Sequence, residues 1–281
     1  MLRFLKMLVG GVFSLSAISM ATLYAYQNKL VYPSWAQGAR NHVDTPDHYN
    51  LPFVERKLMT QDGVQIRAFD IRNENSTSTW LILCPNAGNM GYFLPVVEFI
   101  YRRFNCSVFI YSYRGYGYSE GNPSETGLKL DADCVMSFLQ QDDFYKTQKL
   151  VLFGRSLGGA NAIYIARKYP HLCDALILEN TFLSIRKVIP HVFPFLRYFA
   201  SFCHEVWNSE QEIKKIDPTL PGLFLSGRKD EIVPPQHMER LYALYPSEHK
   251  SLIEFRLGHH NDTIVQDGYW DAVSLFLDKY L

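Results

Sequence analysis

One stretch of the chain, residues 150–168, constrains the fold more than any other. Its first four residues, Leu150-Val151-Leu152-Phe153, are apolar and predict a buried strand, and residues 160–168 predict a helix. Between them the pattern Gly154-x-Ser156-x-Gly158 must turn the chain sharply. Glycine on either side of the serine lets the backbone pass close to itself, and the following helix directs free N–H groups toward the turn. Such a strand, turn and helix are typical of a nucleophile elbow, which presents a serine hydroxyl to a substrate.

Strand and helix patterns alternate along the chain after an initial hairpin. The hairpin is predicted from residues 53–60 and 64–71, whose apolar residues alternate on either side of Asp62-Gly63. Further strands are expected at 80–84, 107–112, 175–179, 222–226 and 252–255, and further helices at 92–104, 124–141, 235–245 and 267–281. Alternating strands and helices imply a mostly parallel sheet covered on both faces. The sequence therefore predicts an α/β fold, with one globular domain over residues 53–281.

Composition argues against several other classes of protein. Lys plus Arg and Asp plus Glu number 28 each, so no charge imbalance indicates a nucleic-acid partner. No phosphate-binding loop, dinucleotide fingerprint or Cys/His metal spacing occurs, so neither a metal nor an organic cofactor is expected. The five cysteines are scattered and odd in number, which favours buried free thiols over a disulfide framework.

The first forty residues differ in character from the rest of the chain. The segment from Met7 to Tyr26 is uncharged and mostly apolar, and its length suits a helix that crosses a membrane. Arg3 and Lys6 precede it, and Lys29 follows it. A cleaved signal peptide and a mitochondrial presequence are the competing interpretations. We expect a retained single-pass anchor and its flank over residues 1–40, in the endoplasmic reticulum or a mitochondrion, and a polar linker over residues 41–52.

Four motifs together resemble one known family. They are Asn86-Ala87-Gly88-Asn89, Gly154-Arg155-Ser156-Leu157-Gly158-Gly159-Ala160, Glu179-Asn180-Thr181-Phe182 and His260-Asn261-Asp262-Thr263. The chain resembles the α/β-hydrolase superfamily and, within it, the membrane-anchored serine hydrolases related to the fungal bud-emergence protein. The resemblance covers essentially the whole chain, and it implies an α/β-hydrolase fold and a serine hydrolase activity. Neighbouring branches of the family include esterases and protein depalmitoylases.

Three residues are candidates for a catalytic triad. A serine hydroxyl needs a base to become a good nucleophile, and the base needs a carboxylate that orients it. In this fold the chain order is serine, acid, histidine, which selects Ser156, Asp230 and His260. Each of them follows a predicted strand, at the edge where α/β sheets carry their sites.

The base and the acid both have competitors. His259 competes with His260, although the family pattern fits His260 better. Glu179 ends a predicted strand and Asp262 adjoins the histidines, so both compete for the role of acid. We interpret Glu179 as a carboxylate that caps the next segment. Arg155, beside the nucleophile, is expected to make a structural salt bridge.

An oxyanion hole needs two N–H donors. One is expected from the backbone of Leu157, which follows the nucleophile. The second should come from the loop after the strand at 80–84. Members of the family usually read His-Gly where this chain has Cys84-Pro85, and proline has no N–H to donate. The family pattern therefore assigns the second donor to Asn86, with Ala87 as the alternative.

Residues 183–215 form the expected cap insertion, rich in apolar side chains. A buried helical pair, an apolar lid over an acyl pocket and a membrane-facing surface are all open at this stage. We expect a membrane-anchored serine hydrolase that cleaves an ester or thioester of an acyl substrate, lipid or acylated protein, through an acyl-enzyme. A non-catalytic membrane scaffold, a serine peptidase and a lipid-binding module are the alternatives.

Overall fold

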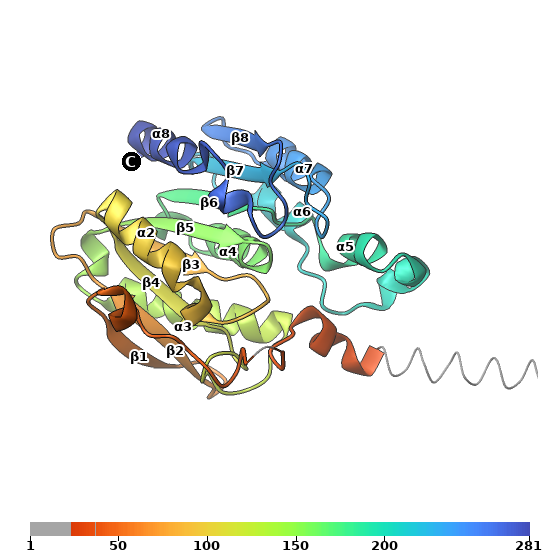
Figure 1. Ribbon diagram of the computed structural model, residues 1–281, viewed down its shortest axis with the longest axis horizontal. Helices are drawn as coiled ribbons and strands as arrows, with labels where there is room; N and C mark the ends of the chain where they lie inside the picture. Colours follow the sequence, from red (N-terminus) through yellow and green to blue (C-terminus); the bar gives the residue numbers. More distant parts are fainter. Residues whose placement is uncertain (1–23, 37) are drawn as a thin grey trace, which may run out of the picture.

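The computed structural model describes residues 24–36 and 38–281, and an eight-stranded sheet runs through it (Figure 1). The strands are β1 (Val54–Met59), β2 (Gln65–Ile71), β3 (Ser78–Leu83), β4 (Ser107–Ser112), β5 (Lys149–Arg155), β6 (Ala175–Glu179), β7 (Gly222–Gly227) and β8 (Lys250–Phe255). Their order in space is β1-β2-β4-β3-β5-β6-β7-β8. β2 pairs antiparallel with β1 and β4, and the remaining pairs are parallel. The predicted mostly parallel sheet with an initial hairpin is confirmed.

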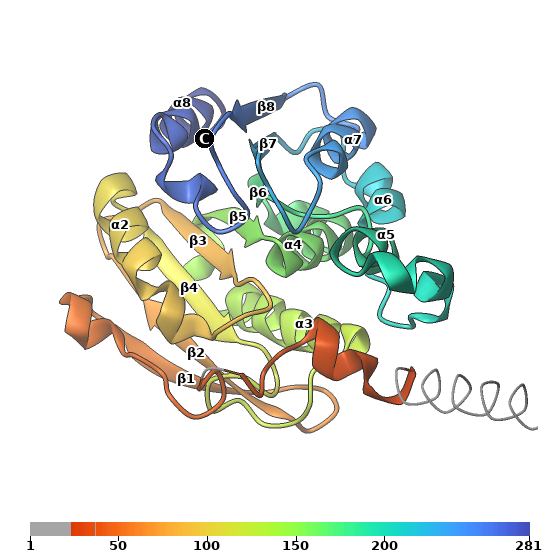
Figure 2. The ribbon, with the colours of Figure 1, turned by 45° about the vertical axis from the view of Figure 1, so that its right-hand side comes forward.

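Helices cover both faces of this sheet (Figure 2). α2 (Leu94–Phe104) and α8 (Tyr269–Tyr280) share one face, where the Trp270 ring lies 4.8 Å from that of Phe99 and 6.0 Å from that of Phe104. α3 (Glu125–Gln141), α4 (Leu157–Lys168) and α7 (Gln236–Leu244) lie on the opposite face. Short 3-10 helices connect these elements: η1 (Pro46–Tyr49), η2 (Met90–Phe93), η3 (Tyr145–Thr147), η4 (Pro170–Leu172) and η7 (Thr263–Val265).

The central strands are unbroken apolar runs because both of their faces are covered. Every residue of β4 and β6 is buried. The register aligns the carboxyl ends of neighbouring strands, since Leu83 pairs with Gly154 and Arg155 pairs with Glu179. The loops after β3, β5 and β6 therefore leave the sheet at one edge, where the candidate site residues are expected.

The cap lies between β6 and β7 and consists of short helices. They are α5 (Ile185–Val192), η5 (Pro194–Phe202), α6 (Ser209–Glu212) and η6 (Ile213–Lys215). α5 has no buried residue, and Phe195 and Tyr198 of η5 are 72% and 76% exposed. The interpretation of the cap as a buried helical pair is wrong, because α5 and η5 pack mainly on each other and project from the domain (Figure 1). The cap instead presents an apolar surface to its surroundings.

The residues before β1 lie against the domain. Residues 24–31 are helical, and Tyr32 and Leu51 are buried. The Asn89 side-chain amide donates to the carbonyls of Ala39 and His42 at 3.0 and 2.6 Å, so the expected flank and linker are held to the loop after β3. The predicted anchor lies almost wholly outside the described residues. Within residues 24–36 and 38–281, no helix is both long and apolar enough to cross a membrane.

Candidate active site

Ser156 lies on the sharp turn between β5 and α4. Its φ of 52° and ψ of −116° place it in a region that residues other than glycine rarely adopt. Two bonds hold this conformation: the Ser156 N–H donates to the Glu179 carbonyl at 2.9 Å, and the Thr181 hydroxyl donates to the Ser156 carbonyl at 2.7 Å. A Cβ on Gly154 would collide with the Gly158 carbonyl, and one on Gly158 would collide with the end of β3. The tight approach of strand and helix therefore requires both glycines.

The imidazole of His260 lies between Ser156 and Asp230. Its Nε2 is 3.1 Å from Oγ of Ser156, and its Nδ1 is 2.7 Å from Oδ2 of Asp230. Oδ1 of Asp230 accepts from the N–H groups of Ile232 and Val233 at 2.9 and 2.7 Å, which leaves Oδ2 to face the histidine. All three side chains are buried. The fold thus brings together residues that are 74 and 30 positions apart in the chain and aligns them as serine, histidine and carboxylate.

The competing residues of the histidine loop lie elsewhere. Nδ1 of His259 is 3.2 Å from the Glu231 carboxylate, and its side chain is half exposed. The Asp262 carboxylate accepts from the backbone N–H of His259 at 2.6 Å. Neither His259 nor Asp262 contacts the Ser156 hydroxyl or the His260 ring in the described part of the chain.

Glu179 does not cap the segment after β6, so that interpretation is wrong. The carboxylate is buried, and it accepts from the Tyr269 hydroxyl at 2.9 Å and lies 3.5 Å from Nε of Arg155. Burial raises the pKa of Glu179, and the nearby Arg155 guanidinium opposes that shift. Arg155 also donates to the His260 carbonyl at 2.9 Å. The structural salt bridge expected of Arg155 is therefore present, and the same guanidinium holds the loop that carries His260.

Asn180 is a site residue whose role the sequence did not reveal. Its side-chain amide donates to the His260 carbonyl at 3.2 Å and to the Thr263 hydroxyl at 2.9 Å. Its side-chain oxygen accepts from the Gly227 N–H at 2.8 Å, at the end of the strand that precedes Asp230. The Asn180 side chain thus connects the loop that carries Asp230 to the loop that carries His260. The sequence did carry a signal for this role, because Asn180 directly follows β6 and belongs to one of the four motifs.

The expected oxyanion donors lie where α4 meets the end of β3. The N–H groups of Leu157 and Asn86 donate to no protein acceptor within the described residues. The N-terminus of α4 adds a positive dipole end at this point. Cys84 itself is a free, buried thiol, and burial raises its pKa to about 12. A thiol held neutral in this way is a poor nucleophile, so Ser156 faces no rival there.

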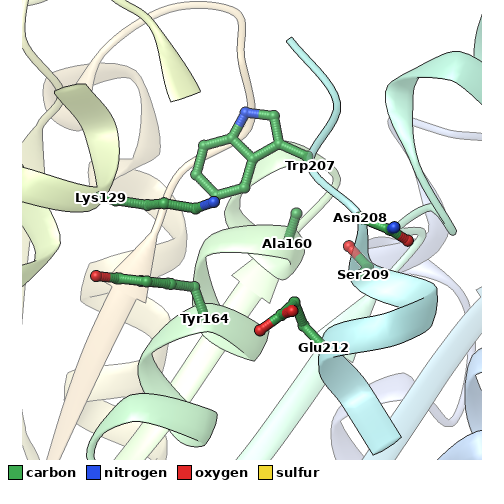
Figure 3. A pocket seen from close by; sticks show the side chains of 7 residues that line it. All are labelled: Lys129, Ala160, Tyr164, Trp207, Asn208, Ser209 and Glu212. Atoms are coloured by element: carbon green, nitrogen blue, oxygen red, sulfur yellow. The ribbon is translucent and has the colours of Figure 1, made fainter. Parts of the chain in front are cut away.

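A small separate hollow lies between α3, α4 and the beginning of α6 (Figure 3). Its lining is Lys129, Ala160, Tyr164, Trp207, Asn208, Ser209 and Glu212. The ammonium group of Lys129 lies 5.2 Å from the centre of the Trp207 ring and 5.5 Å from that of the Tyr164 ring. None of the candidate catalytic residues lines this hollow. It is smaller than pockets that bury an organic ligand, and we assign no function to it.

The sequence is similar to those of several known proteins. The model of the family described as serine aminopeptidase, S33, matches residues 99–212. An uncharacterized membrane protein of Saccharomyces cerevisiae is 64% identical, over 97% of this chain and 96% of its own length. Protein bem46 of Schizosaccharomyces pombe is 44% identical, over 94% and 90%. The α/β-hydrolase domain-containing protein WAV2 of Arabidopsis thaliana is 36% identical, over 100% and 96%.

A solved structure shares the fold. The Pyrococcus furiosus esterase Pf2001 superposes with a TM-score of 0.71 at 19% identity, over 86% of this chain and 98% of the esterase. The likeness confirms the α/β-hydrolase fold that the motifs implied.

Proposed function

This chain belongs to the α/β-hydrolase family that includes bem46, and we propose that it is a serine hydrolase acting on an ester or thioester of an acyl substrate. The observation that carries the proposal is the hydrogen-bonded chain from Ser156 through His260 to Asp230. A fold alone does not define an activity, because one fold hosts many functions. A serine paired with an oriented base is the arrangement that nucleophilic catalysis requires.

The proposed reaction proceeds through an acyl-enzyme. Oγ of Ser156 attacks the acyl carbon while Nε2 of His260 takes its proton, and Asp230 stabilises the resulting imidazolium. The substrate oxygen becomes an oxyanion that accepts from the N–H groups of Leu157 and Asn86. His260 then gives the proton to the leaving alkoxide or thiolate as the C–O or C–S bond breaks. Water attacks the acyl-enzyme with His260 again as base, and the acid product leaves as Ser156 recovers its proton.

The position of the cap supports an acyl substrate. Thr181, which bonds the backbone of Ser156, is only four residues before the start of α5. The cap therefore starts close to the nucleophile along the chain, and we expect its apolar side chains to favour an acyl group over a charged one. The esterase Pf2001, which has the same fold, points in the same direction.

The matched family model favours a second candidate, because its description is that of an aminopeptidase. The same triad would then cleave an amide bond. Hydrolysis of short- and long-chain acyl esters, acyl thioesters and aminoacyl anilides by one preparation separates the candidates. We expect turnover of esters and thioesters; turnover of the anilides alone would replace our proposal with the peptidase.

The nucleophile is tested with a fluorophosphonate probe, which phosphonylates activated serines. Ser156→Ala should abolish labelling of the full-length protein while leaving its thermal unfolding cooperative. Ser226→Ala is the matched control, since Ser226 is also a buried serine, at the end of β7, and its hydroxyl has no hydrogen-bond partner within the described residues. Labelling should survive in the control. Labelling that persists in Ser156→Ala would reject the assignment of the nucleophile. A wild-type protein that is not labelled would leave the scaffold and lipid-binding alternatives standing.

We also propose that the protein acts at a membrane. The uncharged segment from Met7 to Tyr26 supports an anchor, and the yeast relative is named as a membrane protein. An apolar surface adjoins the first described residues, and we call it the aromatic surface. Its members are 41% to 76% exposed and comprise Tyr24, Tyr26, Leu30, Trp35, Phe195, Tyr198, Phe199 and Phe202. The Tyr24 ring lies 5.2 Å from that of His204, which follows η5, so the N-terminal helix lies against the end of the cap's exposed part. A surface of this kind is suited to the lipid headgroup region.

A further inference from the structure

Residues 24–36, which precede the linker, are hydrogen-bonded to the cap. The buried Tyr32 hydroxyl donates to the Glu205 carboxylate at 2.5 Å and accepts from the Trp207 indole N–H at 2.8 Å. Trp207 in turn lies against α3 and α4 (Figure 3). One helical turn earlier, the Asn28 side chain bonds that of His204 at 3.0 Å. The bonds of Asn28 and Tyr32 thus hold the N-terminal segment against the cap.

This segment reaches the active site through one hydrogen bond. The side-chain amide of Asn86 donates to the carbonyl of Val31 at 2.9 Å. Asn86 is the residue whose backbone N–H is the second expected oxyanion donor. Val31 directly precedes Tyr32, so its carbonyl is fixed by the anchoring of its neighbour.

Two buried tyrosines fix the same loop from the other side. The Tyr113 hydroxyl donates to the Cys84 carbonyl, and the Tyr116 hydroxyl donates to the Asn86 carbonyl, each at 2.8 Å. These carbonyls belong to the peptide units on either side of the Pro85–Asn86 peptide. The three bonds together therefore set the direction in which the Asn86 N–H points. A catalytic donor needs a fixed direction, because an oxyanion hole stabilises the oxyanion only when its N–H groups already point toward it.

We propose that the contact between Asn86 and Val31 positions the second oxyanion donor, so that the N-terminal segment completes the active site. The proposal rests on the proposed serine hydrolase function. It also accounts for a loop in which Cys84-Pro85 replaces the family's usual His-Gly, since an outside contact supplies the support that the local sequence lacks. Asn86 is catalytic through its backbone, whereas Val31, Tyr113 and Tyr116 are positioning residues.

The test is the kinetics of Asn86→Ala in the full-length, membrane-bound protein. This variant keeps the backbone N–H and loses only the side-chain tether. With a soluble acyl ester, kcat should fall about 10- to 100-fold while KM changes less than about twofold, because a misaimed donor weakens the transition state more than substrate binding. In Asn86→Asp a carboxylate oxygen, an acceptor, would face the Val31 carbonyl, so kcat of this variant should fall at least as far. Tyr116→Phe should lower kcat in the same direction by a smaller factor.

Asn41→Ala is the matched control, because Asn41 is exposed and lies on the same N-terminal stretch. Its kcat should equal that of the wild type, and the melting temperature of all the variants should stay within a few degrees. A kcat within twofold of wild type in Asn86→Ala would overturn the inference while the proposed function stood. A loss expressed wholly in KM would do the same. A wild-type protein that neither hydrolyses esters nor reacts with fluorophosphonate would overturn both.

Discussion

His259 and His260 are neighbours in the chain, yet their side chains lie in different surroundings. A loop backbone sends successive side chains in different directions, so here one ring enters the site and the other meets Glu231 at the surface. The buried ring bonds two partners at 3.1 and 2.7 Å. The exposed ring of His259 contacts the Glu231 carboxylate at the surface, and contacts of this kind contribute little to stability.

The two histidines should therefore differ sharply on substitution. His260→Ala should lower kcat/KM for ester hydrolysis by about 10³-fold or more, because triad members act as a unit. His259→Ala is the internal control and should stay within about fivefold of wild type. The measurement is steady-state hydrolysis with active-site titration of each preparation. The opposite ranking would transfer the role of base to His259.

At the scale of elements, α7 meets the start of the cap through His237. Nδ1 of this buried histidine accepts from the backbone N–H of Leu183 at 3.4 Å. Burial lowers the pKa of His237 to about 4, and the charges of Lys187 and His191 add to that effect. The neutral ring is therefore the form that fits between the cap and α7.

This pKa shift predicts how stability depends on pH. Because the folded pKa of about 4 lies below the unfolded value near 6.5, the stabilisation is fully present above pH 6.5 and is lost as pH falls toward 4. The loss attributable to His237 should be about 2 kcal/mol between pH 7 and 4.5. His237→Asn keeps an acceptor for Leu183 but does not titrate. Urea unfolding at several pH values gives the free energy of unfolding as a function of pH. This free energy should fall less steeply with falling pH in the variant than in the wild type, and equal dependence on pH would contradict the assignment.

At the scale of the whole molecule, the proposed membrane attachment and the proposed catalysis both depend on the N-terminal segment. Tyr32 is buried between the cap and the domain, and Val31 holds Asn86. An anchor in the preceding residues would place the aromatic surface and the active-site edge near the same membrane. We nonetheless expect attachment and activity to be separable, because the contact with the active-site loop comes from Val31, which follows the predicted anchor.

Two truncations would separate membrane attachment from activity. Removal of residues 1–23 should release the protein from carbonate-washed membranes and leave ester hydrolysis within about threefold of the full-length protein. Removal of residues 1–40 should also release it, but the loss of the buried Tyr32 should cost about 3 kcal/mol of stability. Loss of the Val31 contact should lower kcat as well. Full-length protein in the carbonate supernatant would reject the anchor, and equal activity of the two truncations would reject the role of the segment.

Local patterns predicted the elements because they depend on near neighbours in the chain. Apolar runs gave the buried strands, the alternation around Asp62-Gly63 gave the hairpin, and the two glycines flanking Ser156 gave the strained turn. The motif order also selected Ser156, Asp230 and His260, which the structure brings together, although their catalytic roles stay a prediction.

What the sequence by itself determined was the order of strands and helices, the elbow and the set of candidate residues. Only the tertiary structure decided which partner each side chain meets. Glu179 faces Arg155 instead of capping the segment after it, and Asn180 joins two loops that follow different strands. The cap exposes its aromatic side chains, and Val31 reaches Asn86 across 55 residues of chain. The physical reason is that backbone conformation follows from neighbours a few residues away, whereas these contacts form between segments that approach each other only after the sheet has assembled.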